Sequence, residues 1–401
     1  MEMDIDAGQS AQRVEIDRER QVKAKAYARI RRRLSYVSMG IAAIGVCLLL
    51  FTGIAGWIRD QLGLLNWQPV RGWYPLQVLC FFLIVMLVYE IVIAPLGYYG
   101  FTLSHRYGLS VMTVKSWLRD LLVGLVLELV LGIAALELIY WLLAAQPDSW
   151  WLWVGLILLF FSVIMANLAP VLLFPLFYKF RPLEEGELTR RLLALANRAG
   201  THVRGVYTFD MSRKTTAANA ALMGLGNTRR IVLGDTMLDR YTNEEIEVVL
   251  AHELGHHVHH DIWKLIISQS LVTLAGLYLA NLVFHWAVGT QHLYTGLADA
   301  ATIPLLLALT ALFSFIVMPL NNGFSRYVEY QADEYALQST RMIEPFKGAM
   351  TRMANQNLSD IEPSAVIEFL FYDHPSVGRR LRHADDYSHH MLMNIPGLNR
   401  E

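Results

Sequence analysis

The sequence is poor in charged residues and in cysteine. Only 17% of its 401 residues are Asp, Glu, Lys or Arg, whereas 54% are hydrophobic. An ordinary soluble domain carries about 25% charged residues, so this composition argues against one. The formal net charge of -1 gives no electrostatic basis for a nucleic-acid partner, and none is predicted. Cys47 and Cys80 lie inside apolar segments, which favours small buried hydrophobic residues over a disulfide or a metal site.

The hydrophobic residues gather into segments long enough to cross a bilayer, which takes about 20 apolar residues. The first of these segments contains no charged residue at all. The predicted fold class is therefore mainly α, a multi-span transmembrane helical bundle. Its six predicted spans cover residues 34–58, 75–98, 121–145, 150–178, 265–288 and 301–320.

The positions of lysine and arginine predict the orientation of these spans. Basic residues precede the first span, occur between the second and third, and follow the fourth, whereas residues 146–148 have none. Only the loop after the first span is an exception, with Arg59 and Arg71. The positive-inside rule therefore places both termini and residues 179–261 in the cytosol, at the inner membrane if the source is bacterial.

The spans divide the chain into five predicted parts. Strand patterns at residues 203–209, 217–223 and 230–233 predict a small β-sheet outside the spans. The five parts are a basic cytosolic arm (1–33), four spans (34–178), a cytosolic segment (179–262), two spans (263–321) and a C-terminal cytosolic segment (322–401). In the last part, helices are predicted at residues 324–337, 344–355 and 364–371, with another starting at His374.

The strongest chemical signal is at residues 252–256, which form the sequence H-E-L-G-H. A capping box at residues 242–245 predicts that a helix starts shortly before it. Side chains four residues apart lie on one face of a helix, so His252 and His256 can hold the same metal ion. Glu253 lies beside the first histidine and can take a proton from the attacking water. The pattern is that of zinc-dependent proteases. A zincin-like catalytic unit is therefore predicted, which carries the small β-sheet and consists of the catalytic segments 179–262 and 322–401.

A catalytic zinc ion usually has three protein ligands and one open position. A third histidine ten positions after His252 would fall at Ile262, which cannot bind metal. His260 lies on the same straight helix and cannot close around the ion. A carboxylate from another helix is therefore needed, and Glu329 is the best candidate. Asp333, one turn further on the same face, is placed to hold a ligand histidine through its second ring nitrogen.

These motifs together resemble the type I CAAX prenyl protease family of integral membrane zinc metallopeptidases. Besides H-E-L-G-H, the resemblance rests on three further motifs. The first is S-R-Y-V-E-Y-Q-A-D at residues 325–333, and the second is N-A followed by G-L-G and R-I-V-L within residues 219–233. The third is H-P followed by Arg380 within residues 374–380. It covers roughly residues 34–401. One departure is the count of predicted spans, six here against seven in eukaryotic members.

The resemblance implies how the metal site works. His252, His256 and Glu329 would hold one Zn²⁺ ion. Glu253 would act as general base and then give its proton to the leaving amine. The ion would polarise the scissile carbonyl and lower the pKa of water towards about 7.

The resemblance also implies residues that contact or support the substrate. Asn219 and Ala220 would line an edge strand that pairs with the substrate backbone. His374 and Arg380 would stabilise the oxyanion, each donor contributing roughly 3 kcal/mol. Asp333 would orient a metal ligand.

The predicted function is hydrolysis of peptide bonds in a peptide or protein substrate close to the bilayer, with CAAX-type processing implied by the resemblance. Two alternatives remain open, a heat-shock-type protease for membrane-protein quality control and a non-enzymatic membrane protein that handles metal. The neighbouring histidines at positions 257, 259 and 260 are expected to be solvated. Glu90, Glu128 and Glu137 lie inside predicted spans, and one interpretation is that they line a water-filled chamber. The alternative is that Glu137 reaches water near a span end, whereas Glu90 and Glu128 pair with polar neighbours.

Overall fold

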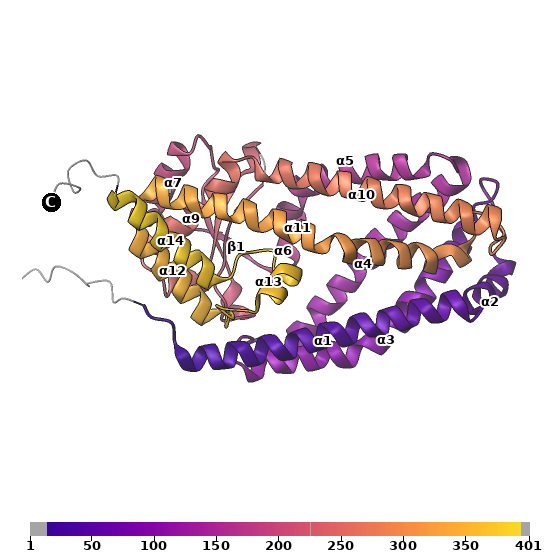
Figure 1. Ribbon diagram of the computed structural model, residues 1–401, viewed down its shortest axis with the longest axis horizontal. Helices are drawn as coiled ribbons and strands as arrows, with labels where there is room; N and C mark the ends of the chain where they lie inside the picture. Colours follow the sequence, from indigo (N-terminus) through magenta and orange to yellow (C-terminus); the bar gives the residue numbers. More distant parts are fainter. Residues whose placement is uncertain (1–13, 225, 394–401) are drawn as a thin grey trace, which may run out of the picture.

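The computed structural model describes residues 14–224 and 226–393, so the first thirteen residues of the predicted arm lie outside it. Among the described residues, six helices are long and apolar enough to cross a membrane, which confirms the six predicted spans. They form the long body of the molecule in Figure 1. The spans are α1 (Arg18–Phe51), α3 (Pro75–Arg106), α4 (Val114–Ala145), α5 (Trp150–Leu172) with the short α6 (Phe174–Phe177), α10 (Asp261–His285) with the π-helical η4 (Trp286–Thr290), and α11 (Ile303–Thr340).

Several of these helices are longer than the predicted spans. α1 begins at Arg18, where Asp17 caps it by accepting a hydrogen bond from the Arg20 amide. Its 34 residues correspond to about 50 Å at 1.5 Å per residue, well beyond the ~30 Å of a hydrocarbon core. Hydropathy detects only the apolar part of such a helix. The helical backbone extends beyond the membrane into water until a residue that disfavours the helix ends it.

The largest difference concerns α11. The sequence predicted a span at residues 301–320 and a separate helix at residues 324–337, but the structure has one uninterrupted helix that contains Pro319. The helix carrying Glu329 is therefore a rigid continuation of a membrane span.

The catalytic unit contains a four-stranded sheet in the order β1-β2-β4-β3. β2 (Val206–Phe209) and β4 (Arg230–Gly234) pair in parallel, and β3 (Ala220–Met223) adds to β4 in antiparallel orientation. All three predicted strands are present. β1 (Phe180–Pro182) is additional, and its three residues are too few to give a recognisable alternation. β3 lies at the edge of the sheet.

Helices pack around this sheet to form the core of the catalytic unit. α9 (Asn243–Val258) is central, and its predicted capping box between Thr242 and Glu245 is confirmed. Buried side chains from the sheet, α7 and α9 make the core, among them Leu192, Ile231, Leu233 and Leu250. The other helices of the unit are α7 (Glu187–Arg198), α8 (Asp235–Leu238), α12 (Ile343–Gln356), α13 (Ala365–Phe371) and α14 (Val377–Met393).

The opposite end of the molecule explains the exception in the charge pattern. Arg59, in the short α2 (Ile54–Gln61), donates to the buried carboxylate of Asp299 at 2.7 Å. An arginine neutralised in this way is a weak topological signal. Nearby, the Trp73 Nε1–H donates to Glu137 at 3.0 Å, a partner that the sequence did not predict.

The amino-terminal end of α1 lies against the catalytic unit. The Asp17 amide donates to Asn355 Oδ1 at 3.1 Å, and Gln21 Nε2 donates to the Ser359 carbonyl at 3.1 Å. Figure 1 shows this end of α1 and the helices α12 and α14 at the same end of the molecule, far from α2. The start of α1 and the catalytic unit are therefore on one side of the spans.

Candidate metal centre and active site

The site depends on a very close approach between α9 and α11. Gly255 lies against the backbone of α11, and a Cβ atom built on it would be 2.9 Å from the Ala332 Cα atom and 3.2 Å from the Ala332 carbonyl oxygen. Only glycine leaves room for two helix backbones at this distance. Because Gly255 lies between the two histidines and Ala332 lies between Glu329 and Asp333, the contact brings these side chains together.

Three side chains converge on one point. His252 Nε2 lies 3.3 Å from Glu329 Oε2, and His256 Nε2 lies 3.4 Å from Glu329 Oε1. One ligand atom from each of the three lies within 4.8 Å of the others, the only such group among the described residues. Within the described part of the chain, the buried Glu329 Oε2 has no hydrogen-bond donor. Two imidazoles and a carboxylate with an unpaired buried oxygen fit a zinc ion with one position left open.

His252 is fixed from behind by a buried ion pair. Its Nδ1 lies 2.9 Å from Asp333 Oδ1, so the Nδ1–H donates to the carboxylate and the Nε2 lone pair faces Glu329. Arg380 Nε donates to Asp333 Oδ2 at 2.8 Å, and Arg380 Nη2 donates to the other oxygen. Asp333 is fully buried and Arg380 is 8% exposed. These contacts place Arg380 behind His252, where it supports Asp333, whereas its oxyanion role stays a prediction.

His256 has a supporting carboxylate that the sequence analysis missed. Its Nδ1 lies 3.0 Å from Asp261 Oδ2, and Lys264 donates to the other oxygen at 2.9 Å. His260, in the left-handed conformation with φ 58°, turns the chain so that Asp261 returns to His256. An aspartate five positions after the motif is the only sequence signal for this contact.

Carboxylates surround His256 and affect its pKa. Burial lowers the pKa of His256, but its hydrogen bonds with Asp261 and Glu329 and the nearby charges of Glu329 and Glu253 outweigh burial and raise it to about 9. The carboxylates around His256 therefore favour a cation at this position.

Glu253 and His374 are less buried than His252 and Glu329. Glu253 is partly exposed, as a group that exchanges protons with substrate must be. His374 Nε2 lies 3.2 Å from Glu329 Oε1, and His374 Nδ1 contacts Asp373 at 3.0 Å. Hydrogen bonds with Asp373 and Glu329 raise the pKa of His374 to about 10 against the opposing effect of burial. His374 is therefore a cation above the site.

Arg326 holds the segment that carries His374. Its Nη1 donates to the Glu368 carbonyl at 3.0 Å and also to the Tyr372 carbonyl. Arg326 thus reaches the loop that precedes His374, which leaves Glu329 free for the metal centre.

The remaining predicted residues lie at the sheet edge and around the motif. Asn219 is exposed and immediately precedes β3, and Ala220 begins this edge strand. His257 Nε2 lies 3.3 Å from Arg229 Nη1. Burial and the charges of Arg229 and His260 lower the pKa of His257. Within the described residues, none of the three neighbouring histidines belongs to a group that could hold a metal.

Comparisons with known proteins agree with this arrangement. The profile described as Peptidase family M48 matches residues 182–388, and the one described as CAAX prenyl protease N-terminal, five membrane helices, matches residues 9–179. Within the described part of residues 9–179 the structure has four helices that could span a membrane. The fold and the matched family define a membrane metalloprotease.

The chain is similar to the uncharacterized metalloprotease YhfN of Bacillus subtilis, with 30% identity over 90% of this chain and 84% of the relative. It is also 30% identical to CAAX prenyl protease 1 of Saccharomyces cerevisiae over 77% of this chain and 72% of that one. The crystal structure of S. mikatae Ste24p superimposes with a TM-score of 0.80 at 27% identity, covering 92% of this chain and 90% of that one. The chain belongs to the CAAX prenyl protease family within peptidase family M48. The quality-control and non-enzymatic alternatives are not favoured.

The close helix contact predicts the effect of Gly255→Ala. The added methyl group meets the backbone of α11, so the helices must separate at a cost of about 1–3 kcal/mol. We expect a lower thermal unfolding midpoint and weaker zinc binding, measured by competition with a chromophoric chelator. Gly124→Ala is the control, because a Cβ at Gly124 meets no atom within 4 Å. Unchanged zinc affinity in Gly255→Ala would contradict the importance of this contact.

The buried Asp333–Arg380 pair predicts the effect of Arg380→Met. Without the guanidinium, the Asp333 carboxylate loses its counter-charge and holds His252 less well, so we expect zinc affinity to fall about 10–100-fold. Arg382→Met is the control, since Arg382 pairs with Glu362 at the surface at 3.2 Å. If Arg380→Met retained zinc affinity and lost only kcat, Arg380 would act on the reacting groups and not through Asp333.

Proposed function

We propose that this chain is a zinc-dependent endopeptidase that cleaves CAAX-type carboxyl-terminal tails at the cytosolic face of the membrane. The observation that carries the proposal is the convergence of His252 Nε2 and His256 Nε2 on the Glu329 carboxylate, one oxygen of which is buried without a donor. A single Zn²⁺ ion is proposed, with these three residues as its ligands. When bound, zinc would act as a Lewis acid on the scissile carbonyl and on water.

The chain's own residues supply the proton transfers and the positioning. Glu253, on the exposed side of α9, accepts a proton from the attacking water and passes it to the leaving amine. His374 lies beside Glu329 as a cation and stabilises the negative charge that develops on the carbonyl oxygen. Arg380 acts indirectly, because its guanidinium holds Asp333, which in turn orients the ligand His252. Asn219 and Ala220 line the edge strand β3, which pairs with the substrate backbone by strand addition.

The proposed substrate class is supported by the position of the site. α10 starts at Asp261, three residues after α9 ends, and the exposed Ile262 and Trp263 follow at once. A tail anchored in the bilayer by a prenyl group would thus meet the active site within a short distance of the membrane surface. The yeast relative is named for CAAX prenyl protease activity, and this chain covers most of its length.

The proposed orientation follows from charge and contacts. The start of α1, with its basic residues, bonds to the catalytic unit, so the positive-inside rule acts on both together. Both termini and the active site are therefore proposed to face the cytosol.

The variant Glu253→Gln tests the catalytic proposal. It retains the shape of the side chain but cannot accept a proton, so we expect the turnover rate to fall by about 10²–10⁴-fold or more. The measurement is cleavage of a farnesylated CAAX peptide by purified protein in lipid nanodiscs, with zinc content determined by atomic absorption.

Zinc should stay bound in Glu253→Gln and be lost from His252→Ala, which serves as the comparison. Treatment with a chelator should abolish cleavage by the wild type, and added Zn²⁺ should restore it. Cleavage that survives in Glu253→Gln would refute the assigned mechanism.

Cysteine labelling tests the orientation. In a variant with Cys47 and Cys80 replaced by alanine, Asp239→Cys and Asp148→Cys place single thiols at opposite ends of the molecule. We expect a membrane-impermeant maleimide to label position 239 only from the cytosolic side and position 148 only from the other. The reverse pattern would show that the site faces outward.

A further inference from the structure

The outer edge of β3 is only partly available to a substrate. The Gly234 amide donates to the Asn219 carbonyl at 2.9 Å, so Asn219 faces β4. Residues of an antiparallel strand alternate between facing the neighbouring strand and facing outward. The backbone groups of Ala220 and Leu222 therefore point to the free edge, and no described residue forms a hydrogen bond to them there.

The next outward-facing residue upstream, Ala218, is already paired. Its amide donates to Asn357 Oδ1 at 2.9 Å, and Asn357 Nδ2 donates to its carbonyl at 3.2 Å. The side-chain amide of Asn357 thus makes the two hydrogen bonds that a residue of a neighbouring strand would make. One outward position further, Gln356 Nε2 donates to the Thr216 carbonyl at 2.7 Å.

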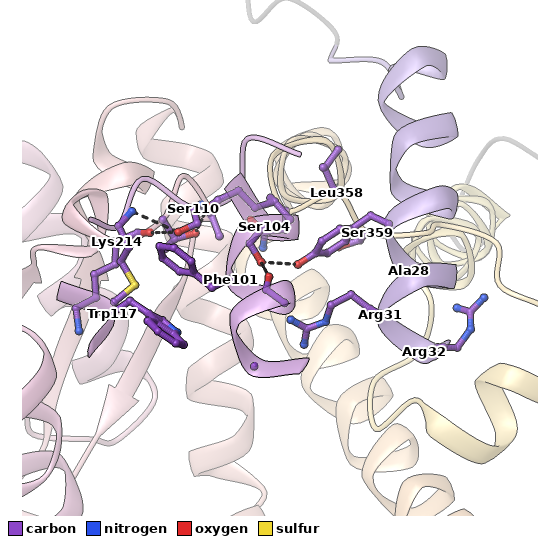
Figure 2. Close-up of a pocket in the computed structure, with 18 of the residues that line it drawn as sticks. Ala28, Arg31, Arg32, Phe101, Ser104, Ser110, Trp117, Lys214, Leu358 and Ser359 are labelled. Atoms are coloured by element: carbon purple, nitrogen blue, oxygen red, sulfur yellow. Dashed lines mark hydrogen bonds between the residues drawn. The ribbon is translucent and has the colours of Figure 1, made fainter. Parts of the chain in front are cut away.

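The loop between the membrane helices α3 and α4 covers the edge upstream of Ala218. The Thr216 amide donates to the Leu109 carbonyl at 3.1 Å, and Ser110 pairs with Thr215 in an antiparallel bridge. Both Leu109 and Ser110 come from the connection between α3 and α4. Figure 2 shows Ser110 and Lys214 in contact, with Leu358 and Ser359 in the same close-up. The edge is therefore closed up to Ala218 and opens at Ala220.

The side chain of Asn357 is held in a fixed position. Its backbone amide ends α12 by donating to the Met353 carbonyl at 2.9 Å, and the Ser359 amide donates to Ala354 at 3.0 Å. Leu358, between them, has a left-handed conformation with φ 48° and is 5% exposed. A buried leucine in this conformation indicates a turn that the surrounding structure imposes.

We propose that Asn357 terminates the substrate-pairing edge and so sets the register in which a peptide lies across the active site. The proposal rests on the proposed endopeptidase function. A peptide added to β3 bonds to Ala220 and Leu222 and cannot continue to Ala218. If the edge of β3 were covered only to prevent pairing with another chain, it would be covered along its whole length. Instead, Ala220 and Leu222, nearest the predicted substrate contact, are left open.

The space beyond Asn357 shows what its removal would change. A cavity of about 970 Å³ lies there, between α1, α3, α4 and the catalytic unit, and Ala217 and Asn357 both line it. Arg31, Phe101 and Trp117 form part of its wall (Figure 2). Without the Asn357 amide, the free edge would extend from Ala220 into this cavity.

Mapping of cleavage positions in Asn357→Ala tests the proposal. The substrates are farnesylated CAAX peptides extended residue by residue at either end, and the products are identified by mass spectrometry. Because the next outward position lies two residues along the strand, products longer by about two residues on one side should rise about tenfold relative to the wild type. Asn357→Asp keeps the side-chain volume but replaces the donor to the Ala218 carbonyl with a charged acceptor, so it should shift the pattern in the same direction.

Asn355→Ala is the matched control. It removes a side-chain amide from the end of α12, but one that bonds to the Asp17 amide and the Glu15 carbonyl just before α1, so its cleavage positions should match those of the wild type. If Asn357→Ala and Asn357→Asp were active and cleaved at the same positions as the wild type, the role of Asn357 would be refuted while the proposed function stood. Absence of Glu253-dependent cleavage in the wild type would overturn the proposed function and this inference with it.

Discussion

The contact between Gly255 and the backbone at Ala332 is the constraint on which the site depends. Two helices distant in sequence approach so closely that a single methyl group would collide with the main chain. At this distance the carboxylate of Glu329 reaches both His252 and His256. Since α11 is also a membrane span, the ligand that completes the metal centre is fixed with respect to the bilayer.

The charges around this contact are arranged in pairs. Burying an isolated charge is costly, and a buried ion pair tolerates burial only when its geometry satisfies both partners. Asp333 lies between His252 and Arg380, and Asp261 lies between His256 and Lys264. Each histidine is thus oriented by a carboxylate that has its own cation. The Glu329 carboxylate differs, because one of its oxygens has no donor among the described residues.

The membrane helices shape the edge of β3 that is proposed to meet the substrate, and they also hold the protein in the bilayer. The connection between α3 and α4 pairs with residues 214–216, and the buried Lys214 forms an ion pair with Asp120 of α4. The sheet edge is thereby tied to the spans at one end and left open at the other. A soluble protease with the same motif has no loop between two membrane spans to use in this way. The spans therefore take part in defining where a substrate can lie.

The sequence by itself determined the spans, the catalytic helix and the family. These depend on local properties, namely long apolar segments, a capping box at Thr242 and the spacing of His252 and His256, and they are visible along the chain. Tertiary structure decided the continuity of α11, the support of His256 by Asp261, the anchoring of the loop by Arg326 and the closure of the edge by Asn357. Each of these joins residues whose relation depends on how helices pack or turn in space. Hydrophobic pattern and motif spacing carry no information about such contacts, because the same side chains could equally face water.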